Sequence, residues 1–467
     1  MSPLVFYGSE IFIDPIIFYI KISLRPVIIM KEPVKKILIA TFVLLIFSSA
    51  LFAQEITIDN IFDDLMSNDQ KKIETSINYI RKNKPLKIID MLRGFIIKNS
   101  ENQKRKRAID ILKIYSKNEI ITTWLKILEK TTDYKLKKRV INYISDLNDM
   151  RMIVPLAEQL KSPFYEVRKA AAIVLEKRGN DRIYPIIMGL AESPNPVHKI
   201  YSLEAMLYLY DKRFYPLLKN LLNEKNKSIR IYALKCILKN KLKDSIYMVR
   251  NIALSDDNNE VRVKAIETIG GFKDGKSLYV LLKTLRDIDK NIRYTTVKTL
   301  HSLNNKNSAY ALSNQLYVEG VDNIKDLIIE TLIRLKKQGD IKGLRKILLN
   351  DENPLLRIKS AYALGYLKED RGISVLVKGL EDRDFRVRAE ICYSLRNYKS
   401  RLVLQTLLET IRNDRKRYVR SSALYTIKKF NDKKAVIPLF DQFSMEKDPV
   451  FREILREILY WYIKKYV

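Results

Sequence analysis

Residues 351–365 read DENPLLRIKSAYALG, in which an acid, a base and regularly spaced apolar residues follow one another. The central part of this stretch recurs as EVRKAAAIVL (166–175), SIRIYALKCI (228–237), EVRVKAIETI (260–269), NIRYTTVKTL (291–300), RVRAEICYSL (386–395) and YVRSSALYTI (418–427). Each copy has an aliphatic residue, then a base, then apolar residues three and seven positions after the base. These positions share one face of a helix, so the stretch predicts an amphipathic helix that recurs along the chain.

The base of each copy anchors a repeat whose spacing stays between 30 and 32 residues. The anchors that we assign are Arg105, Lys137, Arg168, His198, Arg230, Arg262, Arg293, Lys325, Arg357, Arg388, Arg420 and Arg452. After the anchored helix, a polar turn with a potential capping Asp leads to a second apolar helix. One unit is thus a pair of antiparallel helices, which can bury its apolar faces only when units stack.

This pattern resembles the HEAT-repeat family in its short bacterial form, D-x-x-x-x-V-R-x-x-A-x-x-A-L-G, the type found in bilin lyases. Residues 351–365 are the best copy, and the resemblance covers roughly residues 100–460. It implies an all-α fold, a right-handed α-solenoid of about twelve antiparallel helix pairs. We expect a leader over 1–53, an N-terminal helical cap over 54–100, the repeat array over 101–445 and a C-terminal capping helix over 446–467.

The composition agrees with a helical, non-catalytic chain. The 467 residues include only 13 Gly and 14 Pro, fewer than a turn-rich fold needs. Cys236 and Cys392 lie about five units apart, too far for a disulfide, and are expected in the core. His198 and His301 have no partner at ligand spacing, so packing or surface roles are expected for both. No P-loop, G-x-S-x-G, G-x-G-x-x-G or H-E-x-x-H motif occurs. We therefore assign no catalytic residue, cofactor or metal site.

Residues 30–53 have the form of a secretory signal peptide. MKEPVKK provides a basic start, ILIATFVLLIFSSALFA an apolar core, and small residues precede Gln54. We expect cleavage after Ala53, and retention as an anchor helix is the alternative. Met30 stands where an initiator is expected, so our hypothesis is that residues 1–29 are not translated. The leader predicts export to the periplasm or cell envelope.

An acid stands six residues before nine of the twelve anchors. We interpret acids and anchors as an ion-pair ladder that holds one unit in register with the next, in preference to a row of binding arginines. Arg357 is expected to be a paired base beside Asp351. The ladder residues that we assign are Asp256, Arg262, Asp287, Arg293, Asp351, Arg357, Asp382, Arg388, Asp414 and Arg420.

A second set of bases, here called the turn cations, stands thirteen or fourteen residues after the anchors, where the second helix of each unit begins. Equivalent positions stack in a solenoid, so the turn cations are expected to form a ridge with one cation about every 10 Å. The alternative is a solvated turn in a lysine-rich chain. The partner-binding residues that we assign are Arg151, Arg182, Lys212, Lys276, Arg371, Arg401, Lys433 and Lys434; Lys243 and Lys306 hold the same position.

The function predicted from these features is that of an exported, non-catalytic scaffold that binds an extended or acidic protein partner. The 86 Lys and Arg against 54 Asp and Glu give a net charge of +32, which favours an acidic partner. The charge also suits a nucleic-acid or other polyanion binder, although export disfavours nucleic acid. A lyase-like enzyme subunit is the third alternative. Membrane contact is expected only through the leader or weakly through Trp461 and Tyr462.

Overall fold

The computed structural model describes residues 57–147, 149–178, 181–209, 211–336 and 341–466, together with Lys36 and Ala40. Within these ranges all regular elements are helical, with 26 α-helices, seven short 3-10 helices and no strand. The prediction of an all-α solenoid is confirmed in this part of the chain. The leader predicted over 1–53 lies outside the described residues, apart from Lys36 and Ala40.

The chain divides into two compact units, residues 1–149 and 150–467, which are described separately. The helices of the first unit are α3 (Ile58–Met66), α4 (Gln70–Asn83), α5 (Lys87–Lys98), α6 (Asn102–Leu112), α7 (Lys117–Lys130) and α8 (Tyr134–Ile144). They form three consecutive pairs, and the expected N-terminal cap over 54–100 corresponds to α3, α4 and α5.

The second unit contains ten further pairs. Its odd-numbered helices are α9 (Ile153–Glu158), α11 (Ile183–Ala191), α13 (Tyr215–Leu221), α15 (Ile246–Ser255), α17 (Leu278–Thr284), α19 (Ala309–Val318), α21 (Lys342–Asn350), α23 (Asp370–Gly379), α25 (Arg401–Asn413) and α27 (Val436–Met445). Its even-numbered helices are α10 (Tyr165–Glu176), α12 (Pro196–Met206), α14 (Lys227–Lys239), α16 (Asn259–Phe272), α18 (Lys290–Leu303), α20 (Asp322–Leu335), α22 (Pro354–Leu367), α24 (Phe385–Leu395), α26 (Arg417–Phe430) and α28 (Pro449–Tyr466).

Short 3-10 turns introduce or extend several odd-numbered helices. They are η2 (Met150–Met152), η3 (Gln159–Lys161), η4 (Lys212–Phe214), η5 (Lys243–Ser245), η6 (Gly275–Ser277), η7 (Lys306–Ser308) and η8 (Lys433–Ala435). No helix of the described residues is long and apolar enough to cross a bilayer.

Each odd-numbered helix packs more closely on the even-numbered helix that follows it than on the one that precedes it, as α15, α21 and α25 show. All anchors lie in even-numbered helices, so the anchored helix is the second of its unit. The prediction that the anchored helix comes first was wrong. A constant period is the same wherever a unit is taken to begin, so the repeat spacing alone does not distinguish the two groupings.

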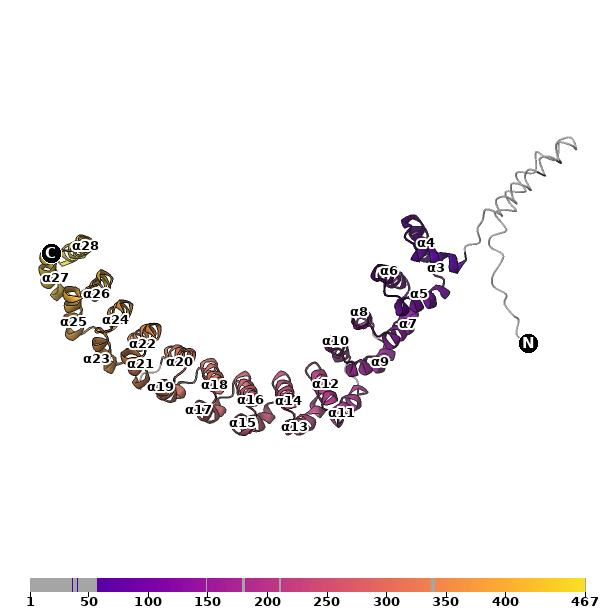
Figure 1. Ribbon diagram of the computed structural model, residues 1–467, viewed down its shortest axis with the longest axis horizontal. Coiled ribbons are helices and arrows are strands. Elements are labelled where there is room, and N and C mark those ends of the chain that lie inside the picture. The colour runs from indigo at the N-terminus through magenta and orange to yellow at the C-terminus, as the bar shows by residue number, and fades with distance from the viewer. Residues whose placement is uncertain are drawn as a thin grey trace. The chain divides into compact units, whose positions relative to one another are not determined.

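In the second unit the helices form two layers. Even-numbered helices contact even-numbered neighbours, as α14, α16 and α18 do, and odd-numbered helices contact odd-numbered neighbours, as α19, α21 and α23 do. Figure 1 shows the two rows. Fully buried aliphatic side chains such as Ile266, Leu281 and Val297 fill the space between them. Burial of each such side chain contributes about 1.5–3 kcal/mol, which no helix pair obtains alone.

The start of the even-numbered helices is fixed by local polar chemistry. In α14, α16, α18, α22 and α24 the residue before the first helical position is Asn or Asp, and its side chain accepts a hydrogen bond from a backbone N–H of the first turn. Such a cap typically stabilises a helix by about 1 kcal/mol. The cap therefore sets the same starting register in successive units.

Gly365 lies where the even-numbered helices α22 and α24 approach each other closely. A Cβ at this position would lie 2.6 Å from Cβ of Ser394 and 2.9 Å from its carbonyl oxygen. Real Cβ atoms do not approach that closely, so a larger residue would force α22 and α24 apart. This contact explains the glycine that ends the sequence DENPLLRIKSAYALG.

Candidate functional site

A ladder of ion pairs connects consecutive units on the anchor side. The described pairs of this kind are Arg105–Asp133 at 2.6 Å in the first unit and, in the second, Lys199–Glu224, Arg230–Asp256 at 2.8 Å, Arg262–Asp287 at 2.8 Å, Arg293–Glu319 at 2.8 Å, Lys325–Asp351 at 2.8 Å, Arg357–Asp382 at 2.7 Å, Arg388–Asp414 at 2.7 Å and Arg420–Glu446 at 3.6 Å. In the second unit, each base reaches the acid that precedes the next anchor.

Arg357 shows how such a base is held. Its Nε and Nη2 donate to the two carboxylate oxygens of Asp382 at 2.7 and 2.9 Å. Its Nη1 donates to the backbone carbonyls of Asp351 and Glu352 at 2.8 and 3.0 Å. The side-chain partner is therefore Asp382 of the next unit, and the expectation that Arg357 pairs beside Asp351 holds only for the Asp351 carbonyl. The carboxylate of Asp351 is bound by Lys325.

The ladder bases are occupied and mostly buried, which removes them from the set of available binding cations. Glu319 illustrates the electrostatics of these pairs. Burial alone would raise the pKa of its carboxyl group, but hydrogen bonds from Arg293, Gln315 and the Val321 N–H outweigh burial and lower that pKa below its usual range. The carboxylate therefore stays charged and fixed between the units.

In the second unit, the ladder departs from the predicted register at the junction between α10 and α12. Lys199, not His198, makes the ion pair with Glu224, while His198 lies 3.0 Å from the Ser193 hydroxyl. The assignment of His198 as an anchor was therefore wrong. Ser193 stands where the other units have an acid, and Arg168 instead binds Glu204 within α12. With Lys199 as anchor, the local spacing is 31 residues on both sides.

The turn cations lie on the other side of the units, in the turns that lead into the odd-numbered helices. All of the partner-binding residues proposed from the sequence are exposed: Arg151, Arg182, Lys212, Lys276, Arg371, Arg401, Lys433 and Lys434. Lys243 and Lys306 are exposed at the same place. The structure thus separates the two basic sets, with the ladder within the unit junctions and the turn cations in solvent.

The odd-numbered helices extend this basic character. The six odd-numbered helices from α11 to α21 contain no Asp or Glu. The average frequency of acids in this chain would place about six there. Their bases are Lys219, Arg250, Lys283, Lys342, Arg345 and Lys346. Of the even-numbered helices α12 to α22, α14, α18 and α22 also contain no acid, whereas α12, α16 and α20 carry Glu204, Glu260, Glu267, Asp322, Asp326 and Glu330. We call the solvent side of α11 to α21 and of the turns that precede them the odd face.

Acids do occur in the turns of the odd face, and three of them are engaged. Asp181 forms an ion pair with Arg213 at 3.0 Å. Asp211 accepts hydrogen bonds from the backbone and guanidinium of Arg213, and these bonds lower its pKa. Asp274 caps its turn and is bound by Arg250 and by the Ser277 hydroxyl. Asp244 is exposed. The odd face nevertheless keeps an excess of bases in every unit from α13 to α21.

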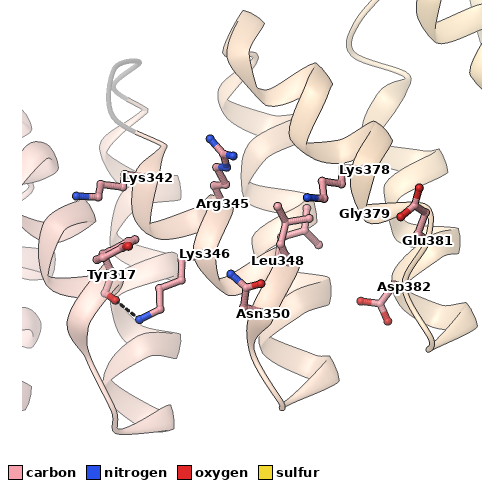
Figure 2. Close-up of a pocket in the computed structure, with 11 residues that line it drawn as sticks. Tyr317, Lys342, Arg345, Lys346, Leu348, Asn350, Lys378, Gly379, Glu381 and Asp382 are labelled. Carbon is pink, nitrogen blue, oxygen red and sulfur yellow. Dashed lines mark hydrogen bonds between the residues drawn. The ribbon is translucent and has the colours of Figure 1, made fainter.

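A groove of about 600 Å³ lies along α19, α21 and α23, and the acids Glu381 and Asp382 also line it. Lys346 donates to the carbonyl of Tyr317 at 2.6 Å, and Lys342 lies 4.3 Å from the Tyr317 ring centre. Arg345 of α21 and Lys378 of α23 also line the groove (Figure 2). The sequence analysis did not select these cations, because they lie within helices and outside the fixed turn position.

The sequence analysis also missed a row of tyrosines beside the turn cations. Tyr184, Tyr215, Tyr247, Tyr279 and Tyr310 occupy the same place, near the start of α11, α13, α15, α17 and α19, at spacings of 31 or 32 residues. The signal was present in the sequence as YPIIMGL, YPLLKNLL and YVLLKTL. Regular spacing of an aromatic residue next to a regular base could have identified the row.

The cysteines and histidines form no recognisable centre. Cys236 and Cys392 are fully buried, and burial raises the pKa of both thiols. The side chain of His301 contacts Thr331 and Arg334. Among the described residues, no three His, Cys, Asp or Glu side chains gather as metal ligands could.

The stacked helix pairs, the occupied ladder and the long exposed face define an α-solenoid repeat protein. A family model of HEAT repeats matches residues 153–237, 246–333 and 341–428. These segments cover more than half of the chain, which therefore belongs to the HEAT-repeat family. No curated protein matches the sequence closely enough to count as a relative.

Solved structures with a similar fold include a mutant of Kap121p and importin beta. A mutant of Kap121p is 14% identical, with a TM-score of 0.52 over 85% of this chain and 50% of that chain. Importin beta is 13% identical, with a TM-score of 0.42 over 86% of this chain and 61% of that chain. The chain thus spans between half and two thirds of the length of these proteins. At this identity the likeness is one of fold.

Proposed function

We propose that this protein is a scaffold that binds an acidic protein partner along the odd face of its second unit. The observation that carries the proposal is the absence of acids from the odd-numbered helices α11 to α21, next to a row of exposed turn cations. A surface with one sign of charge attracts an oppositely charged partner and fixes its orientation. Successive units are stacked at roughly 10 Å, so the face suits a partner that is extended along the solenoid.

The ion-pair ladder supports the choice of the turn cations as the binding residues, because the ladder bases are already paired. The guanidinium groups of Arg293 and Arg388 each donate hydrogen bonds to a carboxylate and to a backbone carbonyl. Little of their charge is therefore available to a ligand. The turn cations are exposed and take no part in the ion-pair ladder between units. The proposal gives the chain no catalytic step, since it requires only exposed charge at a regular spacing.

Charge reversal on the odd face tests the proposal. We would combine Lys212→Glu, Lys243→Glu, Lys276→Glu and Lys306→Glu, and measure binding to acidic proteins captured by the wild-type chain. The matched control reverses four exposed lysines of even-numbered helices, Lys239, Lys298, Lys429 and Lys464, with the same change in net charge. We expect binding to fall sharply only in the first variant. Equal binding by both variants would contradict the proposal.

Salt dependence separates this function from polyanion binding. A nucleic-acid binder loses affinity steeply with salt, because each neutralised phosphate releases a counterion. A protein partner that also packs on tyrosines should retain part of its affinity at high salt. Titration with a single-stranded oligonucleotide and with an acidic protein at two salt concentrations distinguishes the two.

We also propose that the scaffold is exported to the cell envelope. The support is the sequence of residues 30–53, with its basic start, apolar core and small residues before Gln54. N-terminal sequencing of the native protein should find a start near Gln54. An intact Met30 or Met1 in a cytoplasmic fraction would contradict export.

A further inference from the structure

Five tyrosines form a continuous strip on the odd face, and three of them are well exposed. Tyr247, Tyr279 and Tyr310 expose 49%, 50% and 68% of their surface. Tyr184 and Tyr215 are half-buried members of the same row. We call these five residues the tyrosine strip. The core next to Tyr279 is filled by the aliphatic side chains of Val280 and Leu281 on α17, which are fully buried. The exposed tyrosine rings are therefore not needed to fill the core.

Two members of the strip cross the junction to the next unit. The Tyr184 hydroxyl lies 3.4 Å from the Arg213 carbonyl, and the Tyr215 hydroxyl 3.5 Å from the Asp244 carbonyl. Burial and the neighbouring Tyr247 raise the pKa of Tyr215, so these two strip members lie close together. Tyr184 and Tyr215 therefore reach the turn of the following unit.

The turn cations alternate with these rings. Lys212 precedes Arg213 in the turn that Tyr184 contacts, and Lys243 precedes Asp244 in the turn that Tyr215 contacts. Lys276 and Lys306 hold the corresponding places before Tyr279 and Tyr310. The surface thus offers an aromatic ring and a cation once per unit, at a repeat of roughly 10 Å.

We propose that the strip binds an extended peptide in the polyproline II conformation whose carboxylates recur every third residue. This inference rests on the proposed function and specifies its partner. A polyproline II helix has three residues per turn and rises about 9 Å per turn, close to the spacing of the units. Its prolines pack on aromatic side chains, and its conformation is already formed before binding. The carboxylates of successive turns then face Lys212, Lys243, Lys276 and Lys306.

Other peptide conformations fit the strip less well. A β-strand returns to the same side about every 7 Å, which falls out of step with the units after one repeat. An α-helix docks through an apolar groove. Among the described odd-numbered helices α11 to α19, the exposed large apolar side chains are Tyr247, Tyr279, Tyr310, Tyr317 and Val318, which form no aliphatic groove.

Two peptides of equal composition test the inference. One consists of six repeats of Glu-Pro-Pro, and the other of three repeats of Glu-Glu-Pro-Pro-Pro-Pro, which breaks the spacing of the carboxylates. Fluorescence anisotropy with the full chain should show at least about tenfold tighter binding of the first peptide, because only it engages several units at once. Equal affinities would overturn the inference.

Tyrosine variants provide the second arm. The triple variant Tyr247→Ala, Tyr279→Ala, Tyr310→Ala should lose at least about tenfold in affinity for the periodic peptide. The matched control removes three exposed tyrosines of even-numbered helices, Tyr362, Tyr393 and Tyr425, and should bind as the wild type does. Phe at the three strip positions keeps the rings and should keep the affinity, which separates binding from folding. Equal losses in strip and control variants would overturn the inference.

The outcomes separate this inference from the proposed function. If both peptides bind equally, and the charge-reversed variant of the turn cations binds neither, the acidic scaffold stands and the polyproline II register is wrong. If neither peptide nor any acidic protein binds the wild-type chain, the proposed function itself is wrong.

Discussion

Arg168 of α10 and Glu204 of α12 form an ion pair of 2.6 Å in which each side chain is only 7% exposed. Arg168 also donates to the Ser162 carbonyl at 2.7 Å and lies 3.8 Å from the Tyr201 ring centre. Glu204 replaces the ladder acid that Ser193 does not provide. The junction keeps a buried carboxylate opposite its arginine, although the acid comes from a different place in the sequence.

The stability lost when Glu204 is replaced should be recovered in part by an acid at a second position, Ser193. We expect Glu204→Gln to lower the free energy of unfolding by about 3 kcal/mol, because it leaves the buried Arg168 without its charge partner. Adding Ser193→Glu restores an acid six residues before Lys199, where other units have it, and should recover part of the loss. Thermal denaturation measures both effects. Ser193→Gln should not rescue, and equal rescue by Gln and Glu would contradict the register argument.

Arg357 and Lys433 should differ strongly in their effect on stability. Arg357→Ala leaves the Asp382 carboxylate and two backbone carbonyls without their donor, at a cost of about 3 kcal/mol. Lys433 is exposed, so Lys433→Ala should change the free energy of unfolding by less than about 0.5 kcal/mol. Urea denaturation compares the two variants. Similar midpoints would show that the ladder does not stabilise the unit junctions.

The ladder carboxylates predict a loss of stability in acid. The pKa of Glu319 is lowered from an ordinary value of 4.5, so its contribution is complete above that value and disappears as the pH falls through the lower, folded-state pKa. The difference in free energy of unfolding between wild type and Glu319→Gln should therefore be largest near neutral pH and shrink below about pH 4.5. A difference that grows toward acid would contradict this sign.

The two cysteines should be unreactive in the folded protein. Cys236 and Cys392 are completely covered, and burial raises the pKa of each thiol, which disfavours the reactive thiolate. A thiol reagent should modify neither until denaturant is added, and then both. Rapid modification of either thiol under native conditions would show that its helix opens locally.

The sequence predicted the fold because one helical face recurs at a nearly constant period. The aliphatic residue before each anchor and the apolar residues after it are buried in the structure, as Val261, Ala265 and Ile269 of α16 show. The prediction that the anchored helix comes first in its unit was wrong, because the repeat spacing is the same wherever a unit is taken to begin. Only the contact between α15 and α16 reveals that the anchored helix comes second.

The side-chain pairings were less accessible to sequence analysis. Position six before the anchor identified most ladder acids, but the spacing did not show that Arg357 reaches forward to Asp382 while it binds the Asp351 carbonyl. Glu204 was missed because it lies inside a helix, away from the fixed position. The exposed tyrosines were read as part of apolar helix starts, and only their solvent exposure in the structure distinguishes Tyr279 from the buried Val280.

The central claim is that an acidic partner lies on the odd face, and lysine footprinting tests it most directly. The wild-type chain is labelled with an amine reagent, with and without an acidic polypeptide such as polyglutamate, and the modified lysines are quantified by mass spectrometry. The account predicts that Lys212, Lys243, Lys276 and Lys306 become protected while Lys239, Lys298 and Lys429 keep their reactivity. Protection of the second group, or equal protection of both, would contradict it.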